Sequence, residues 1–193
     1  MDAFSTLTSN AVPFARDNID TDQILPARYL ARPRNDNHGE YLFRDLRQTA
    51  DFPLNRPEWQ AARIVLGGRN FACGSSRENA VWALYDHGVR AVIAPSYGDI
   101  FATNSVKNGL LPVVLPEAVV QGLIAATEAD PNAQITVDLP SQTVTGPDGA
   151  VHHFDIDPFN KRCLLEALDE LAFTLTHAED IAAFERRIGR ENF

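Results

Sequence analysis

A short stretch of the sequence combines residue types that could do chemistry together. Residues 74–78 read Gly-Ser-Ser-Arg-Glu and lie between an apolar segment at 63–66 and a helix-like pattern. The first N–H groups of a helix are unpaired and carry partial positive charge, so they attract anions. Arg77 adds a planar group that can hold a carboxylate by two hydrogen bonds. The stretch therefore indicates a site for an anionic ligand, with two serine hydroxyls beside it.

Plain helix capping is an alternative explanation of the same residues. A serine at the N-cap with a glutamate nearby is a common helix start, so Ser75 and Glu78 could serve only the helix. The sequence leaves both interpretations open. Two other patterns are less suitable, because a Walker phosphate loop needs Gly-Lys-Ser/Thr and a nucleophile elbow needs Gly-x-Ser-x-Gly.

Asp20, Thr21 and Asp22 form a second polar group. They could bind a hard metal ion or support other site residues. They could also form an Asx turn that caps a helix expected at 26–30, where Pro26 suits a first helical turn.

Histidines and cysteines give no metal-ligand pattern. No two of the five histidines have the helical i,i+4 spacing of a metal pair, and we interpret them as structural. A four-iron cluster needs three or four thiolates, whereas this chain has two cysteines, Cys73 and Cys163. We interpret Cys73 as a buried small residue rather than a nucleophile or an iron ligand. No disulfide framework is expected.

Composition limits the partners. The chain has 193 residues, of which 45% are hydrophobic and 22% charged, as in ordinary globular proteins. Its formal net charge of −9, with no run of Lys or Arg, disfavours binding to nucleic acid or to an anionic membrane. The start lacks a secretory signal pattern, and the most apolar segment, 110–126, contains two prolines and cannot span a bilayer as one helix. We expect a cytoplasmic protein.

The elements that must position these residues alternate between strand and helix in the middle of the chain. This alternation predicts βαβ units and a parallel sheet. We expect strands at 63–66, 89–94 and 111–115, and helices at 75–87, 97–107 and 116–127. Towards the N-terminus we expect a strand at 7–14, helices at 26–30 and 41–48, and a polar loop at 31–39.

The C-terminal part has a different pattern. Strand-like segments at 134–139, 142–145 and 151–156 predict a β-meander. Two helices at 158–174 and 178–189 close the chain. The leucines of the first helix recur at helical spacing, so we expect them to pack on the core: Leu164, Leu165, Leu168 and Leu171.

Three segments together resemble one known family. GGRNFACGSSRENAVWAL at 67–84, GVRAVIAPSYGDIFATNSVKNGLLPVVL at 88–115 and DTDQILPARYL at 20–30 resemble the swivel domain of the aconitase superfamily. Within it they are similar to the small subunits of 3-isopropylmalate dehydratases. Asn79 is a departure, since many relatives carry histidine there.

The resemblance implies an α/β fold, a swivelling β/β/α domain. This fold has a mixed, largely parallel sheet flanked by helices, then the β-meander and two closing helices. It implies one domain over 1–193, with a helical extension from about 160. It also implies a hydro-lyase that interconverts 2-isopropylmalate and 3-isopropylmalate through 2-isopropylmaleate in leucine biosynthesis. The partner would be a large subunit that holds a [4Fe-4S] cluster, while this chain itself would bind neither cofactor nor metal.

The resemblance also assigns roles to residues. Ser75 matches the serine alkoxide that takes a proton, and Arg77 matches the arginine that holds a substrate carboxylate. Ser76 matches a neighbouring substrate contact. Thr21 and Asp22 match residues close behind the active site.

The loop after Leu30 matches the region that distinguishes substrates. Relatives that bind a tricarboxylate present an arginine there, whereas isopropylmalate needs an apolar wall. We expect Leu30 and Ala31 to lie near the substrate's alkyl group. We expect Arg32 and Arg34 to face solvent or the partner.

Two other functions remain open. The chain could be the small subunit of a related hydro-lyase, such as homoaconitase or a dimethylmalate- or citraconate-type dehydratase. It could instead be a free-standing anion-binding module. Such a module would bind its anion alone, whereas a subunit would be inactive until its iron–sulfur partner is added.

Overall fold

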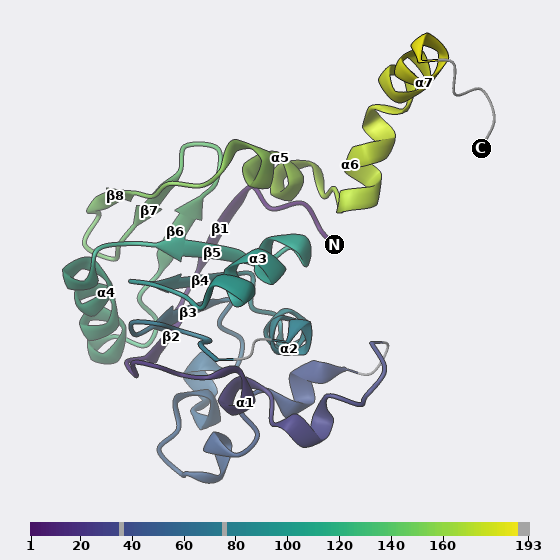
Figure 1. The fold of residues 1–193 in the computed structure, drawn as a ribbon. Coiled ribbons are helices and arrows are strands. Elements are labelled where there is room, and N and C mark those ends of the chain that lie inside the picture. Colours follow the sequence, from purple (N-terminus) through teal and green to yellow (C-terminus); the bar gives the residue numbers. More distant parts are fainter. Residues whose placement is uncertain (35–36, 75–76, 189–193) are drawn as a thin grey trace.

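Two four-stranded sheets form the body of the molecule in a computed structural model that describes residues 1–34, 37–74 and 77–188 (Figure 1). The first sheet is parallel, with the order β2-β3-β4-β5: β2 (Ala11–Phe14), β3 (Ile64–Gly67), β4 (Ala91–Ala94) and β5 (Leu111–Val114). The second sheet is antiparallel, with the order β1-β6-β7-β8: β1 (Thr6–Ser9), β6 (Ile135–Asp138), β7 (Thr143–Thr145) and β8 (Val151–His153).

The parallel sheet lies between two hydrophobic cores. Successive side chains of a strand point to opposite faces, so Ile64 and Leu66 enter one core while Val65 enters the other. The core around Val65 is covered by α2 (Glu78–His87). The opposite core contains buried side chains of α4 (Glu117–Ala129) and of the antiparallel sheet. The third helix of the α/β region, α3 (Asp99–Lys107), contacts α2 and β5.

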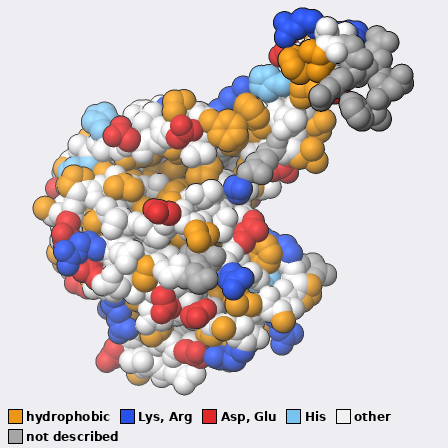
Figure 2. Space-filling model, in the orientation of Figure 1, with side chains coloured by type: hydrophobic (Ala, Val, Ile, Leu, Met, Phe, Trp, Pro, Cys, Tyr) orange, Lys and Arg blue, Asp and Glu red, His pale blue; other side chains and the backbone are white. Residues whose placement is uncertain are grey.

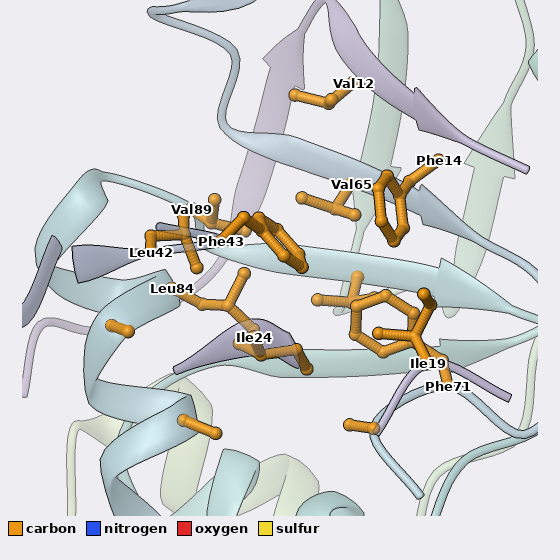
Figure 3. Packing of buried hydrophobic residues seen from close by; sticks show 14 of the residues in the cluster. Val12, Phe14, Ile19, Ile24, Leu42, Phe43, Val65, Phe71, Leu84 and Val89 are labelled. Carbon is orange, nitrogen blue, oxygen red and sulfur yellow. The ribbon is translucent and has the colours of Figure 1, made fainter. Parts of the chain in front are cut away.

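Figure 3 shows how the N-terminal segments complete the first core. Phe14, Phe43 and Phe52 pack together with ring centroids 4.9–5.5 Å apart. Ile24 comes from α1 (Thr21–Ile24), and Leu84 comes from α2. The segment between β2 and β3 is therefore part of the core, although it contains little regular structure.

The predicted fold class is confirmed, but the expected strand at 7–14 is wrong. It is divided at Asn10 into β1 and β2, and each half joins a different sheet. The Asn10 amide nitrogen donates to the carbonyl oxygen of Glu58 at 2.7 Å and so holds the turning point. Instead of the one mixed sheet that was predicted, the structure therefore has a parallel sheet and a separate antiparallel sheet. The predicted β-meander is present as β6, β7 and β8.

The predicted helices at 26–30 and 41–48 are wrong. These regions contain short 3₁₀ turns, as do residues before β3: Ala27–Tyr29, His38–Tyr41, Leu46–Gln48, Pro53–Asn55 and Pro57–Trp59. Phe43 has a φ of 51°, which an α-helix does not allow. Its buried ring explains why the chain accepts this conformation.

The C-terminal helices are α5 (Pro158–Glu166), α6 (Glu170–Thr176) and α7 (Ala178–Arg187). The predicted helix at 158–174 is interrupted because Ala167 is left-handed, with a φ of 56°. Leu164 is buried as expected, but Leu171 is 68% exposed, so its predicted core role is wrong. Figures 1 and 2 show α6 and α7 extending away from the body. No helix among the described residues is long and apolar enough to cross a membrane.

The single domain over 1–193, with a helical extension from about 160, remains a prediction. Truncation tests how much the last two helices, α6 and α7, contribute to its stability. Removing residues 169–193 should change the free energy of unfolding by no more than about 1 kcal/mol, because described apolar side chains of α6 and α7 such as Leu175 and Phe184 are exposed. For a chain of this size that is about 2–4 °C in melting temperature, measured by circular dichroism. A larger loss would show that these helices belong to the cooperative core.

Candidate active site

The candidate site is formed by loops at the carboxyl ends of the parallel strands. In open α/β sheets, ligands bind at this edge. The loop after β3 leads to Arg77, the loop after β2 leads to Asp20 and Thr21, and the loop after β4 leads to Gly98.

Backbone hydrogen bonds join the loop after β3 to the loop after β2. The Asn18 N–H donates to the carbonyl oxygen of Arg69 at 2.8 Å, and the Cys73 N–H donates to that of Ile19 at 2.9 Å. The Thr21 N–H donates in turn to the Cys73 carbonyl at 3.2 Å. Thr21, whose position was predicted to support the site, is therefore attached directly to the loop that leads into 74–78.

An ion pair reinforces this junction. The Arg69 guanidinium donates from Nε and Nη2 to Asp17 Oδ2 at 3.0 and 2.8 Å. The Arg69 hydrogen bonds keep the pKa of Asp17 below its usual value. Because both groups face solvent, the pair orients the loops more than it stabilises the fold.

The loop after β4 also binds the loop after β3, on the side away from the loop after β2. The Phe71 N–H donates to the Ser96 carbonyl and the Gly98 N–H donates to the Phe71 carbonyl, both at 3.0 Å. The buried Phe71 ring packs edge-on against Tyr97 and Phe101, with centroids 6.4 and 5.8 Å away. The loop after β3 is thus anchored on both sides.

The anchored loop has an unusual backbone. Asn70, Ala72 and Gly74 have φ values of 54°, 57° and 86°, and Asn18 opposite them has 55°. Left-handed backbone costs a residue with a Cβ about 1–2 kcal/mol. Such conformations gather at functional sites, where the surrounding structure holds them in place. The strain at Ala72 therefore supports a functional role for the chain that follows it.

Arg77 is exposed and forms no ion pair with any described residue. It occupies the N-cap position of α2, which begins at Glu78, and its side chain makes no capping hydrogen bond. Glu78 accepts a hydrogen bond from Asn108 Nδ2 at 2.8 Å, so it is bound to the end of α3. The guanidinium of Arg77 is therefore available for a ligand. Ser75 and Ser76 lie outside the described residues, and their predicted roles stay predictions.

Asp20 caps a helix, which was the alternative to a role in metal binding or in supporting the site. The capped helix is not the one expected at 26–30. Asp20 Oδ1 accepts from the Gln23 N–H at 2.7 Å, and Gln23 Oε1 accepts from the Asp20 N–H at 3.1 Å. This reciprocal capping box starts α1, not a helix at Pro26. Thr21 is buried and Asp22 is exposed in the first turn of α1.

The loop expected to distinguish substrates lies along α2. The Asn79 side chain donates to the Leu30 carbonyl at 3.4 Å, so Leu30 is held beside the first turn of α2. Ala31 follows and is exposed. Arg34 is exposed, as expected of an arginine that faces solvent or the partner. It pairs with Asp86 near the other end of α2 at 3.0 and 3.1 Å.

The described residues do not fit an iron–sulfur cluster. Cys73 is partly buried beside Asp20, and Cys163 is buried on α5. No group of three or more His, Cys, Asp and Glu side chains that could hold a metal is present in the described part of the chain.

The anchoring residues Asp17, Arg69 and Gly98 were not predicted from the sequence. Asn18, Asn70 and the glycines near them gave a usable signal, because asparagine and glycine favour left-handed backbone. Two loops with such residues indicate tightly shaped turns at one edge of the sheet.

Comparison with known proteins identifies the family. The model of the aconitase C-terminal domain family matches residues 1–118, and a LeuD_N model matches residues 121–158. The 3-isopropylmalate dehydratase small subunit of Chloroflexus aurantiacus is 51% identical over 96% of this chain and 95% of its own. The one from Paramagnetospirillum magneticum is 46% identical over the same shares. The chain belongs to the 3-isopropylmalate dehydratase small-subunit family. The expected resemblance is confirmed.

A solved structure of this family agrees with the fold. The 3-isopropylmalate dehydratase LeuD of Methanocaldococcus jannaschii superposes with a TM-score of 0.68 at 25% identity, covering 93% of this chain and 99% of that one. The matched aconitase segment includes every predicted site residue of this chain, from Thr21 to Arg77.

Gly98 offers a test of the anchored loop. A Cβ at this position would lie 2.6 Å from the Ala72 carbonyl oxygen, so Gly98→Ala must displace the loop. We expect a loss of about 1–3 kcal/mol in stability, as in overpacked sites. Activity of the assembled enzyme should also fall.

Gly122→Ala is the matched control. Gly122 lies in α4, and a Cβ there meets nothing within 4 Å. This variant should gain up to about 1 kcal/mol through helix propensity. Equal effects of both substitutions on melting temperature and kcat would contradict the role of the close contact at Gly98.

Proposed function

We propose that this chain is the small subunit of an isopropylmalate isomerase, a hydro-lyase of leucine biosynthesis. The reaction removes water from 2-isopropylmalate to give 2-isopropylmaleate and adds it back to give 3-isopropylmalate. The observation that carries the proposal is the 46–51% identity, over nearly the full length of both chains, to proteins named as small subunits of this enzyme. The cytoplasm is the proposed location.

The same family name supports a large-subunit partner. Because the described residues here do not fit a cluster, we assign the [4Fe-4S] group to that partner. When bound there, it would supply Lewis acidity toward the substrate's hydroxyl and carboxylate. The small subunit would contribute the groups that hold the substrate and move its proton.

Arg77 has the properties that a carboxylate anchor needs. It is exposed, it has no ion-pair partner among the described residues, and it stands at the N-terminus of α2, where unpaired N–H groups favour an anion. Its planar guanidinium can hold one carboxylate of a dicarboxylate substrate through two hydrogen bonds.

Ser75 is proposed as the group that takes the proton from the C–H beside a substrate carboxylate. A serine alkoxide is a strong base and needs cationic or N–H stabilisation. Arg77, two residues away, is the nearest cation along the sequence. Ser76 is proposed as a neighbouring substrate contact, while Thr21 and Asp22 support the site from α1.

Leu30 and Ala31 are proposed to contact the isopropyl group. The pairing of Arg34 with Asp86 supports this, since it engages that guanidinium near the far end of α2. Arg32 lies over the Tyr41 ring, with its guanidinium carbon 5.7 Å from the centroid. Both contacts favour an apolar wall over the extra cation that a tricarboxylate hydro-lyase requires.

Ser75→Ala and Arg77→Lys should affect catalysis differently. Loss of the proposed base should lower kcat by about 10²–10⁴-fold, with substrate still bound by Arg77. Arg77→Lys keeps the charge but loses the two-donor geometry, so KM should rise strongly. Both are measured anaerobically with the purified heteromer on 2-isopropylmalate.

The melting temperature of the same samples separates catalysis from a purely structural role. Arg77, not Ser75, is the N-cap of α2, so a structural Ser75 would only support the loop before the helix. In that case Ser75→Ala should cost about 1 kcal/mol of stability and leave turnover nearly normal. That outcome would contradict the proposed base.

Ala31→Arg tests the apolar wall. The added cation should lower kcat/KM for isopropylmalate, where methylene-scale contacts contribute about 1–3 kcal/mol, and should favour a substrate with a further carboxylate. Ala27→Arg is the control, because Ala27 is also exposed and lies in the preceding 3₁₀ turn. If the two variants have the same ratio of kcat/KM values, the loop does not select the substrate.

A further inference from the structure

An open hollow of about 680 Å³ lies at the end of α2 opposite Arg77. His87, the last residue of α2, lines it, and the ten residues of the helix separate the two ends by about 15 Å. The other walls come from the 3₁₀ turn at 38–41 and from the segment 44–55. The hollow is therefore distinct from the candidate active site.

Two arginines of the hollow have no ion-pair partner. Neither Arg44 nor Arg47 forms a salt bridge or side-chain hydrogen bond with any described residue, although Asp86 and Glu40 also line the hollow. Both oxygens of Asp86 are already bound by Arg34. Among the described residues that line the hollow, Arg44 and Arg47 thus carry two positive charges against one carboxylate, Glu40, that Arg34 does not bind. The hollow keeps an excess of positive charge, although Asp45 beside it also interacts with Arg44.

The two guanidiniums are close enough to affect each other. Partial burial and repulsion from Arg44 lower the pKa of Arg47, which nevertheless remains charged at neutral pH. Arg44 is exposed and Arg47 is half-buried, so their mutual repulsion is only partly screened by solvent, and a bound anion would relieve it. The backbone at Arg47 is fixed, because Asn55 Nδ2 donates to its carbonyl oxygen at 2.8 Å.

His87 provides a third polar group. Nε2 of its ring is buried with no hydrogen-bond partner among the described residues. The close approach of Gly39, where a Cβ would lie 2.6 Å from the His87 backbone nitrogen, keeps the 3₁₀ turn against the end of α2. Burial, and then repulsion from Arg47, lower the pKa of His87.

We propose that this hollow binds the phosphoryl group of a small molecule. Two guanidiniums offer more N–H donors than the two oxygens of one carboxylate can accept, whereas a phosphoryl group presents three acceptor oxygens and close to two negative charges. Such a ligand would neutralise Arg44 and Arg47 together and bring an acceptor near the imidazole of His87. The ligand is either free phosphate or a phosphate monoester.

Binding is tested by calorimetry on the full chain with inorganic phosphate and with adenosine monophosphate, at constant ionic strength and with sulfate-free chloride buffer. We expect saturable binding of one phosphoryl group per chain. The Arg44→Ala/Arg47→Ala variant should raise Kd at least tenfold. Arg56→Ala is the control and should leave Kd unchanged, because Arg56 pairs with Glu58 outside the hollow. Tighter binding of the monoester would identify it as the source, and equal binding would identify free phosphate.

The imidazole pKa of His87, measured by nuclear magnetic resonance, provides a second test. A purely structural role of the two arginines would not make this pKa respond to phosphate. Charged and titratable groups around His87 are those of the hollow and of its neighbours: Glu40, Arg44, Arg47, Asp86, Arg34 and His38. Phosphate should raise the imidazole pKa of His87 in the wild type and in Arg56→Ala, but not in the double variant. The proposal is overturned if phosphate binds no more tightly than chloride, or if the double variant binds it equally well. It is also overturned if binding to the free chain disappears in the complex with the large subunit, since a partner side chain then fills the hollow.

Discussion

The loop that leads into 74–78 depends on hydrogen bonds from the two neighbouring loops. Ala72 in a left-handed conformation costs about 1–2 kcal/mol. Five backbone hydrogen bonds join this loop to residues 18–21 and 96–98, and each contributes about 0.5–1.5 kcal/mol. Their sum exceeds the cost at Ala72, so these hydrogen bonds can hold that residue in its left-handed conformation. The candidate site therefore exists only when β2, β3 and β4 are already paired in register.

Pairing of those strands depends in turn on the division of the N-terminal segment at Asn10. β1 completes the antiparallel sheet, while β2 provides the parallel edge from which residues 15–21 extend to the site. One continuous strand could not serve both sheets. The adjacent residues Ala11 and Val12 are both buried, but each lies in a different hydrophobic core. The antiparallel sheet thus supports the site indirectly, by covering the back of the parallel one.

Much of this architecture could be predicted from the sequence, and the failures have a physical pattern. Strands such as Ile64–Gly67 and helices such as α4 have buried apolar runs or amphipathic spacing, which are local signals. The break at Asn10 depends on which partner strand each half meets, and no local signal carries that information. Similarly, the ion pair of Arg34 with Asp86 could not be predicted, because the two residues lie 52 positions apart. The motif at 74–78 could be recognised, whereas the anchors Asp17 and Gly98 could be found only from the fold.

α2 connects the two regions for which we propose ligands. Its first turn holds Leu30 through Asn79, and its end holds Arg34 through Asp86. Residues 30–34 therefore run along α2. They lead from the proposed substrate wall towards the hollow lined by Arg47. Asp86 accepts from Arg34 and also from the His38 N–H, at 3.1 Å. It therefore joins the loop that we propose to contact the substrate to the turn that forms one wall of the hollow. An anion in that hollow would act on Asp86 electrostatically. Its charge would thus influence the same carboxylate that binds Arg34.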